Sequence, residues 1–541
     1  MMENKKINYF KPLLILAMVI LALFVGVKLG RVFAPKYYSV SGSSNSMARI
    51  MDYISKYYVD PVNIDSLGDK YIPKILKELD PHSIYIPAAE LQMNNEPLEG
   101  NFDGIGVGFT TIADTIVVTA VFQGGPAQAA GIYFGDKILA VNDSTVAGKK
   151  IVNDSLIKML RGKSGSKVTV KIQREGENEL LPIEITRGTI PINSIDVAYM
   201  ITPTTGYVSM NKFSKTTYSE FVTAVKTLHE AGMQNLILDL RDNTGGFMDQ
   251  VIAVTSELFA EKKMIVYTQG RAFMRENKYS EGKGICSDDN IAVLINNHSA
   301  SASEILAGAV QDNDRGTIIG QRSYGKGLVQ HMIDLPNKAG LRLTIARYYT
   351  PSGRSIQRPY GHGMSEVKDY YEETNRRYQT GEMLSADSIK QTDTTKYYTA
   401  NGRVVYGGGG ITPDIFVPSE LYGEYVKGLN ETFLKYTIQY GGKYRNALSQ
   451  MENTSQLEKF LEDNNPYPGF YEYLAHEGVK NPSKDVEKTT QQIDMLLKMH
   501  IGQISNLHEL GAFFFRNQTD SIVIKAIDVL EKVRSTPDNA D

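Results

Sequence analysis

Cysteine and histidine are scarce in this chain of 541 residues. The single cysteine, Cys286, cannot form a disulfide within the chain. With only 8 histidines, the sequence has neither a Cys/His metal cluster nor an H-E-x-x-H zinc signature. We therefore predict no metal and no cofactor. Scarce cysteine fits a reducing compartment and equally an exported protein without disulfides, so it does not decide the compartment.

An excess of basic charge is also absent. The chain has 58 Lys and Arg against 61 Asp and Glu, a formal charge of -3. It has no general attraction to phosphate backbones, so nucleic acid is not a predicted partner. With 42% hydrophobic residues, the chain can bury proper cores, and its length predicts about three or four domains.

An apolar segment at residues 12–27 lies between basic residues, with Lys11 before it and Lys28 after it. This pattern is typical of a membrane-targeting segment. An uncleaved signal anchor and a cleaved signal peptide both remain open, because the segment is short for a full span. We favour an anchor within residues 1–34, with the rest of the chain outside the inner membrane, in the periplasm or another extracytoplasmic space.

The pattern of apolar and polar residues divides the remaining chain into four regions. Residues 46–96 show helical periodicity, in two amphipathic runs that pack either on each other or on a partner chain, so a homo-oligomer is possible. Residues 97–188 read as a small β-rich module with glycine turns. Strands and helices alternate over residues 189–418, which predicts an α/β core with a polar insertion or mobile excursion at about 359–400. Residues 419–541 are predicted to be a helical C-terminal appendix, which makes the fold class multidomain α/β.

A buried strand at residues 291–295 runs into small residues and then into a helix. This arrangement places a serine hydroxyl at a helix N-terminus, where free backbone N–H groups and the helix dipole favour a developing negative charge. Ser299, Ser301 and Ser303 all lie there. Each can equally be a helix cap, which is the commoner role for serine at this position.

Lys326 lies between two glycines just before an apolar run. A lysine can accept a serine proton only when it is neutral, so this role requires a pKa lowered from about 10.4 by burial. The alternative is an ordinary loop lysine. Residues 320–326 also match most of a phosphate-binding P-loop motif. The match fails because Gly327 occupies the position of the motif's Ser/Thr, and because the following residues predict a strand where the motif requires a helix.

The segment from His298 to Ile305, followed by Lys326, resembles the carboxyl-terminal processing peptidases, or tail-specific proteases, of peptidase family S41. Further similar stretches are Tyr57-Tyr-Val-Asp-Pro61, Asp80-Pro-His-Ser-Ile-Tyr85 and Gly407-Gly-Gly-Gly-Ile-Thr-Pro-Asp414. The resemblance implies a ClpP/crotonase-like core. It also implies Ser301 as nucleophile, Lys326 as general base and Gln330 as the group that orients the lysine.

The same resemblance implies an oxyanion hole formed by the backbone N–H of Ala302 and of a glycine in the turn after residue 243. Thr244 stands where the family usually has proline. Which glycine donates, Gly245 or Gly246, therefore stays open at this point.

The β-rich module resembles PDZ domains in two stretches, residues 101–109 and residues 125–142. Backbone N–H groups of a glycine-flanked loop can converge on a terminal carboxylate while the adjacent strand edge pairs with the peptide. The resemblance implies that this loop comprises Gly104, Ile105, Gly106 and Val107. A shift of two residues, to 106–109, is the alternative register.

Together these features predict an ATP-independent serine endopeptidase of the cell envelope that captures substrate C-termini with its PDZ-like module. The alternative is a catalytically silent scaffold that uses the PDZ-like surface for binding alone. A scaffold needs none of Ser301, Lys326 and Gln330, so their presence favours the enzyme.

Overall fold

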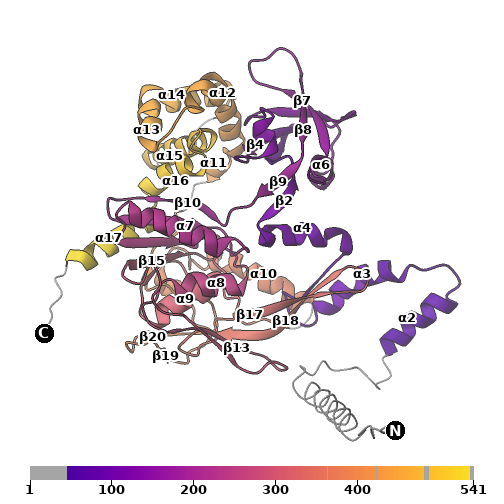
Figure 1. Cartoon of the computed structure of the whole chain (residues 1–541), viewed down its shortest axis with the longest axis vertical. Coiled ribbons are helices and arrows are strands. Elements are labelled where there is room, and N and C mark those ends of the chain that lie inside the picture. The colour runs from indigo at the N-terminus through magenta and orange to yellow at the C-terminus, as the bar shows by residue number, and fades with distance from the viewer. Residues whose placement is uncertain (1–45, 362–363, 421–423, 480–485, 536–541) are drawn as a thin grey trace, which may run out of the picture. The chain divides into compact units, whose positions relative to one another are not determined.

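The computed structural model describes residues 46–361, 364–420, 424–479 and 486–535 (Figure 1). It divides into two units, one up to Tyr71 and one from Ile72 onward. The predicted anchor, residues 1–34, lies outside the described residues. Among the helices that the structure describes, none is both long enough and apolar enough to cross a membrane.

The first unit contains helix α2 (Ser46–Tyr57) and the beginning of α3 (Ile64–Leu76). Both helices form where the three- and four-residue spacing of apolar residues predicts them. No residue of α2 is buried, and Met47 and Ile50 are 53% and 51% exposed. Its apolar side chains therefore contribute to no core within the described residues.

The second unit opens with the end of α3, followed by strand β1 (Ile84–Ile86) and helix α4 (Ala88–Glu99). The region predicted to be helical, 46–96, thus also contains a strand. Tyr85 is buried with Leu76 and Ala339, so β1 belongs to the packing of the core.

The β-rich module is a six-stranded antiparallel sheet, in the order β3-β4-β5-β7-β8 with β6 beside β5. Alternating apolar side chains such as Val168, Val170 and Ile172 point into its core. Its strands are β3 (Val107–Ile112), β4 (Thr115–Val121), β5 (Lys137–Val141), β6 (Ser144–Thr145), β7 (Lys167–Gln173) and β8 (Leu181–Thr186). Its helices are α5 (Pro126–Ala129) and α6 (Asn153–Leu160), and β2 (Asn101–Gly104) pairs with β9 (Gly188–Pro191) where the chain enters and leaves.

The α/β core is built on a second six-stranded sheet, in the order β10-β11-β12-β15-β16-β21. All neighbours from β11 onward are parallel, which requires the helical crossovers that the sequence predicts. The strands are β10 (Ile195–Met200), β11 (Thr205–Met210), β12 (Asn235–Asp239), β15 (Asn290–Ile295), β16 (Thr317–Gly320) and β21 (Ile415–Phe416).

Helices cover both faces of this sheet. On one face, side chains of α7 (Thr217–Glu230), α8 (Met248–Ser256) and α9 (Ala302–Asp312) form the largest apolar cluster with the strands. On the other face, Val523 and Ala526 of α17 (Ser521–Ser535) pack on Tyr207, Ile237 and Leu294. The C-terminal region therefore completes the core and is not a separate appendix at this point.

A smaller sheet lies beside the core, in the order β1-β18-β13-β14 with β17 paired to β18. Its strands after β1 are β13 (Met264–Gln269), β14 (Glu276–Tyr279), β17 (Leu328–Asp334) and β18 (Gly340–Tyr349). The pairing of β1 with β18 brings the segment around His82 next to β17, far from it in sequence.

The insertion at about 359–400 is largely structured, which corrects the expectation of a mobile excursion. It contains helix α10 (Met364–Gln379), the 3-10 turn η1 (Ala386–Ser388) and strand β19 (Tyr397–Tyr398), which pairs with β20 (Val404–Val405). The buried Arg377 of α10 forms an ion pair with Glu382 and donates to the carbonyls of Arg322 and Ser323. These contacts fix the insertion to the core.

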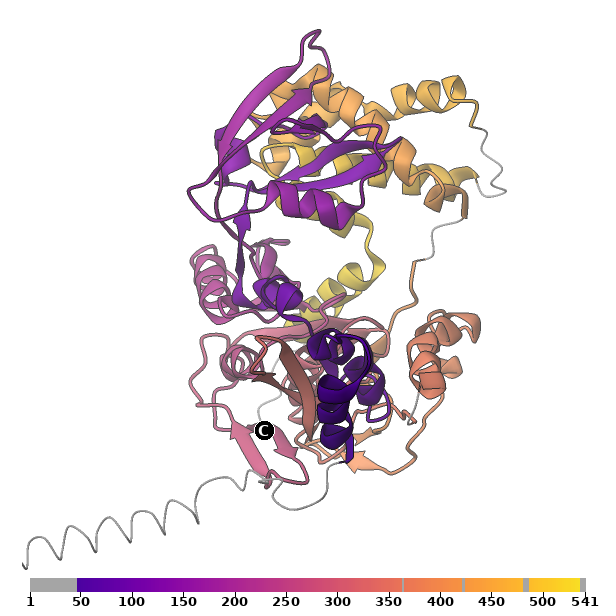
Figure 2. The same ribbon diagram turned by 90° about the vertical axis from the view of Figure 1, so that its right-hand side faces the viewer.

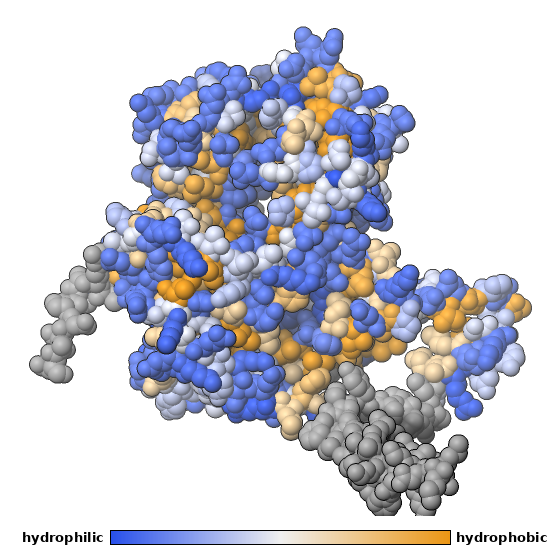
Figure 3. Space-filling model, viewed as in Figure 1, coloured by the Kyte–Doolittle hydropathy of each residue, from blue (hydrophilic) through white to orange (hydrophobic). Residues whose placement is uncertain are grey.

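The C-terminal region is helical, as predicted, and comprises α11 (Glu424–Lys427), α12 (Asn430–Leu448), α13 (Thr454–Asp463), α14 (Pro466–His476), α15 (Val486–Ile504), α16 (Glu509–Thr519) and α17. Helices α11 to α16 share their own aromatic core around Phe433 and Phe470, whereas α17 packs on the sheet. Both ribbon views show α12 beside the β-rich module, and Gly135 there lies against Ile438 (Figures 1 and 2). The face in Figure 3 is mainly hydrophilic, with hydrophobic side chains in scattered patches.

Candidate active site

Ser301 lies at the N-cap of α9, directly after the strand–turn that follows β15. Its backbone has φ 57° and ψ -112°, a strained conformation for a residue with a side chain. Ser301 forms a capping box with Glu304, whose side chain accepts the Ser301 N–H at 2.8 Å. Ser301 thus has the geometry of a helix cap and also lines the cleft, so the capping alternative and the predicted nucleophile role both stay open.

Glu304 ties the backbones of Ser301 and Lys326 together. One carboxylate oxygen accepts the N–H of Ser301 at 2.8 Å and the N–H of Lys326 at 2.9 Å. The other oxygen accepts the Ser323 hydroxyl at 2.6 Å and the Gly325 N–H at 2.7 Å. Burial raises the pKa of Glu304 above its ordinary value despite these four bonds.

Tyr348 makes a second link between the same two residues. Its phenol contacts the carbonyl oxygen of Ser301 at 2.9 Å and also that of Lys326. The ring is buried at the end of β18. Glu304 therefore fixes the backbone N–H groups of Ser301 and Lys326, and Tyr348 fixes their carbonyl groups.

The Lys326 amine lies partly buried and donates to Gln330 Oε1 at 2.9 Å. Burial, and secondarily the positive charge of Arg342, lower the pKa of Lys326 to about 8. This shift has the direction that a general base requires, because it enlarges the neutral fraction near neutral pH.

A hydrogen-bonded chain continues behind Gln330. Its amide donates to the carbonyl oxygen of His82 at 2.6 Å, and the His82 ring contacts the Tyr370 hydroxyl at 2.9 Å. Burial, followed by the charge of Lys326, lowers the pKa of His82 to about 3, so the imidazole is neutral. Through Tyr370, the insertion contacts His82, which accepts a hydrogen bond from Gln330, the partner of Lys326.

Gly245 and Gly246 lie beside the nucleophile, in the turn after β12. A Cβ at Gly245 would come within 2.8 Å of the Ser301 Cβ, so this position requires glycine. The Gly245 N–H already donates to Asn243 Oδ1 at 2.9 Å. Among the described residues, neither the Gly246 N–H nor the Ala302 N–H at the start of α9 has an acceptor.

These groups open into one cleft of about 620 Å³ between α4, the turn after β12, α9 and the β17–β18 hairpin. Ser301, Ala302, Lys326, Gln330, Gly245 and Gly246 all line it. Apolar side chains form most of its remaining wall: Leu98, Phe247, Met248, Ile305, Leu328, Val329 and Met332. Such a wall suits an apolar side chain of an extended polypeptide.

The structure brings the predicted catalytic residues into one cleft but does not join all of them. Within the described residues, no hydrogen bond links the Ser301 hydroxyl to the Lys326 amine, which donates to Gln330. In structures without substrate, catalytic hydrogen bonds often tighten only when the substrate binds.

The predicted carboxylate-binding loop spans the end of β2 and the start of β3. Ile105 is buried, Gly106 has φ 79°, and the carbonyls of both accept bonds from Ala127 and Phe122. Among the strands that the structure describes, β3 pairs only with β4, so its other edge is unpaired there. An open strand edge is the feature to which a peptide strand adds.

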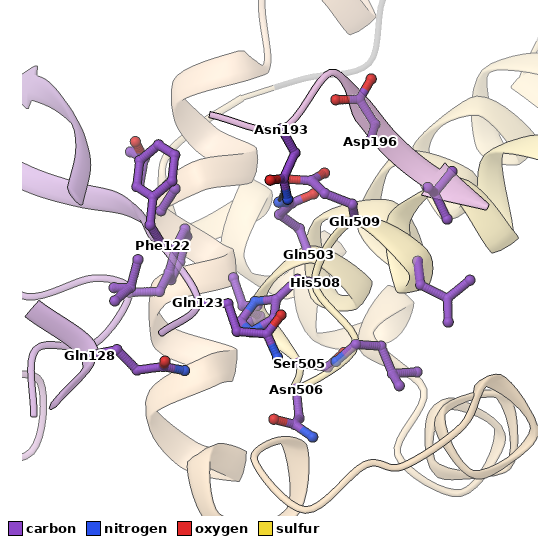
Figure 4. Close-up of a pocket in the computed structure, with 18 of the residues that line it drawn as sticks. Phe122, Gln123, Gln128, Asn193, Asp196, Gln503, Ser505, Asn506, His508 and Glu509 are labelled. Carbon is purple, nitrogen blue, oxygen red and sulfur yellow. Dashed lines mark hydrogen bonds between the residues drawn. The ribbon is translucent and has the colours of Figure 1, made fainter. Parts of the chain in front are cut away.

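A second cavity, of about 530 Å³, lies apart from the catalytic residues (Figure 4). Figure 4 shows Phe122 and Gln128 of the β-rich module, Asn193 of the core and His508 of the C-terminal region around it. The β-rich module, the core and the C-terminal helices therefore meet at this point.

Sequence reasoning missed Glu304, Tyr348, His82 and Arg342 as members or supports of this site. The spacing of Ser301 and Glu304 is that of a capping box, which offers a signal for the glutamate. The other three come from segments distant in sequence, and only the sheet pairings bring them near.

Comparisons with known proteins agree with this architecture. The family model described as peptidase family S41 matches residues 204–363, and the PDZ domain model matches residues 104–185. The core, its cleft and these matches define a serine-type peptidase that carries a PDZ domain.

Individual relatives identify the family more closely. A carboxy-terminal-processing protease of Bartonella bacilliformis is 36% identical over 313 residues, which cover 57% of this chain and 71% of the relative. A probable CtpA-like serine protease of Staphylococcus epidermidis is 32% identical over 306 residues, 56% of this chain and 61% of the relative. The chain belongs to peptidase family S41, and it is similar to this carboxy-terminal-processing protease and to this probable CtpA-like serine protease.

Among solved structures, the photosystem II D1 C-terminal processing protease is similar, with 24% identity and a TM-score of 0.35. The match covers 72% of this chain and 97% of that protein.

Proposed function

We propose that this protein is an ATP-independent endopeptidase in which Ser301 attacks the scissile carbonyl and Lys326 serves as general base. The observation that carries the proposal is the shared cleft, in which a hydroxyl at a helix N-terminus and a lysine with a lowered pKa face the same space.

The reaction proceeds through an acyl-enzyme. Ser301 Oγ bonds to the carbonyl carbon while the hydroxyl proton passes to the Lys326 amine. The negative carbonyl oxygen accepts hydrogen bonds from the N–H groups of Ala302 and Gly246. Lys326 then protonates the leaving amine, the peptide C–N bond breaks, and water releases the acyl group by the same route.

Gln330 keeps the Lys326 amine in position, and Glu304 and Tyr348 hold the two catalytic residues at a fixed separation. For Ala302 and Gly246 the support is that both N–H groups lack an acceptor among the described residues. Gly245 supports them by allowing the close approach to Ser301.

The PDZ domain captures the C-terminus of the substrate through the loop of Gly104, Ile105, Gly106 and Val107. The open edge of β3 supports pairing with the bound tail. The substrates are cell-envelope proteins, because the apolar segment at residues 12–27 acts as an inner-membrane anchor with the rest of the chain on the periplasmic side.

Incubation of the full chain with an unfolded reporter protein, without ATP, tests the proposal. Ser301→Ala and Lys326→Ala should each abolish cleavage while the melting temperature stays near that of wild type. Lys326→Arg should also be inactive, since a guanidinium stays protonated. Normal cleavage by Ser301→Ala would refute the assignment, and tail binding without cleavage by wild type would favour the silent scaffold.

A protease-accessibility assay on intact and permeabilised cells tests the location. A tag placed after residue 541 should be cut by added protease only after the outer membrane is permeabilised. The tagged protein should sediment with the inner membrane.

A further inference from the structure

Arg342 of β18 is a cation in the catalytic cleft without a partner. Three charged side chains line the cleft: Glu99, Lys326 and Arg342. Glu99 forms an ion pair with Lys215, and Lys326 donates to Gln330. Within the described residues, Arg342 has no ion pair and no side-chain hydrogen bond.

The strands around Arg342 offer it no anion. Its neighbours across the sheet are Met332 on β17 and Ile84 on β1, both apolar. Burial lowers the pKa of Arg342, and no carboxylate opposes that shift. Arg342 is only partly buried, so its guanidinium keeps access to water and can also accept an anion that enters the cleft.

The position of Arg342 limits which chemical groups can bind to its guanidinium. Its charge acts on Lys326, so the guanidinium lies near the reacting groups. A group bound there must therefore belong to a substrate residue close to the scissile bond. At neutral pH an unmodified polypeptide carries negative charge only on carboxylates, which a guanidinium binds through two parallel hydrogen bonds.

We propose that Arg342 is a specificity-determining residue that binds a substrate carboxylate beside the scissile bond. The inference rests on the proposed peptidase function and deepens it. The carboxylate is either an aspartate or glutamate side chain of the substrate or the free end of a short tail that lies in the cleft.

Three quenched fluorogenic peptides separate these sources. The first is neutral near the cleaved bond and amidated at its C-terminus, the second replaces one flanking Gln by Glu, and the third has the neutral sequence with a free C-terminus. Each is tested with the full-length wild type, with Arg342→Gln and with Arg347→Gln. Arg347 lies on the same strand but is exposed outside the cleft, so it is the matched control.

Wild type and Arg347→Gln should cleave one carboxylate peptide with kcat/KM about 10-fold or more above the neutral peptide. Arg342→Gln should remove that preference. The ratio between peptides is the measured quantity, because loss of the Arg342 charge also changes the basicity of Lys326 in the reaction with the neutral peptide. Arg342→Lys, which keeps the charge without the paired geometry, should retain part of the preference.

A second readout is the pH dependence of kcat. A carboxylate bound to Arg342 reduces the positive charge felt by Lys326, so the acid limb should lie at higher pH for the preferred peptide than for the neutral one. In Arg342→Gln the two acid limbs should coincide.

Equal cleavage of all three peptides by wild type would overturn the proposal. So would a preference that survives in a folded Arg342→Gln, and a surviving preference for the free terminus alone would assign that recognition to the PDZ domain. Failure of wild type to cleave any peptide or protein would instead overturn the proposed function itself.

Discussion

Two side chains, those of Glu304 and Tyr348, each hydrogen-bond to the backbone of both Ser301 and Lys326, which lie in different segments of the chain. Glu304 accepts the N–H of each residue, and Tyr348 contacts the carbonyl of each. Because these links hold backbone atoms, Ser301 and Lys326, the proposed nucleophile and base, keep their separation before any substrate arrives. Fixed geometry of this kind lowers the cost of reaching the transition state.

Glu304→Gln should lower kcat by about 100-fold with little change in KM. The carboxylate accepts four hydrogen bonds, whereas an amide has one acceptor oxygen, so its NH2 group faces at least one N–H donor in either orientation. The same change should cost about 1–3 kcal/mol of unfolding free energy, measured by urea titration.

Ser323→Ala is the control for Glu304→Gln. It removes one bond to the carboxylate but leaves the N–H groups of Ser301 and Lys326 bound, so it should lose stability with a smaller loss of kcat. Equal kcat values for Glu304→Gln and wild type would contradict the positioning role.

The pKa of Lys326 sets the pH dependence of the reaction. Only the neutral amine accepts a proton, so kcat/KM should rise with pH and level off above about 8. At pH 7, roughly a tenth of the molecules should be active. A pH–rate profile with a short peptide checks this, and a midpoint near that of a free lysine would show that the cleft does not shift the amine.

At the residue scale, the sequence predicted the site through local spacing and family resemblance. Ser301, Lys326 and Gln330 were found because they lie in short recognisable segments. Their roles remain predictions. Arg342 and Tyr348 could not be found, because each lies in an ordinary strand whose neighbours depend on long-range pairing.

Among the elements, α17 gives the clearest prediction of how a substitution changes stability. Val523 is 0% exposed and packs on the sheet face opposite α9, while the next residue, Ile524, is 48% exposed. Val523→Asp should lower the unfolding free energy by about 3 kcal/mol or more, because it buries an unpaired carboxylate. Ile524→Asp should stay within about 0.5 kcal/mol of wild type. Chemical denaturation followed by circular dichroism measures both.

Periodicity predicted most helices and strands of the core but not their partners. The sequence predicts alternating strands and helices over residues 189–418 but not where each one ends, and α8, for example, ends at Ser256. Because residues 359–400 are polar in composition, the sequence did not predict that this insertion is packed against the core. Charged side chains such as Lys368 and Arg376 are exposed, but Arg377 is buried. Tyr370 of the insertion also packs on the guanidinium of the buried Arg358.

Across the whole molecule, the PDZ domain rests on the C-terminal helices. Gly135 approaches Ile438 so closely that a Cβ would lie 2.8 Å from its Cγ2, and Arg445 stacks over the Tyr133 ring. The position of the PDZ domain therefore depends on α12.

Gly135→Ala should loosen this contact and speed hydrogen exchange along α12. Gly131→Ala is its matched control, because both glycines have positive φ but no atom lies within 4 Å of a Cβ at Gly131. Both variants should lose about 1 kcal/mol from backbone strain, and only Gly135→Ala should expose α12. Identical exchange in the two variants would contradict a contact that holds the domain.

The C-terminal helices also bind the other end of the core. Arg241, which follows β12, donates to Asp520 at 2.7 Å, and Arg516 donates to the Tyr207 hydroxyl at 2.9 Å. None of this could be predicted from the sequence, because ion pairs between distant segments leave no local pattern.

The cover that α17 provides has a consequence for biosynthesis. A nascent chain that has emerged only as far as residue 520 already contains Ser301, Lys326 and the whole PDZ domain, but it lacks Val523 and Ala526, which pack on Ile237 and Leu294. We therefore expect the core to become stable only after α17 has been synthesised.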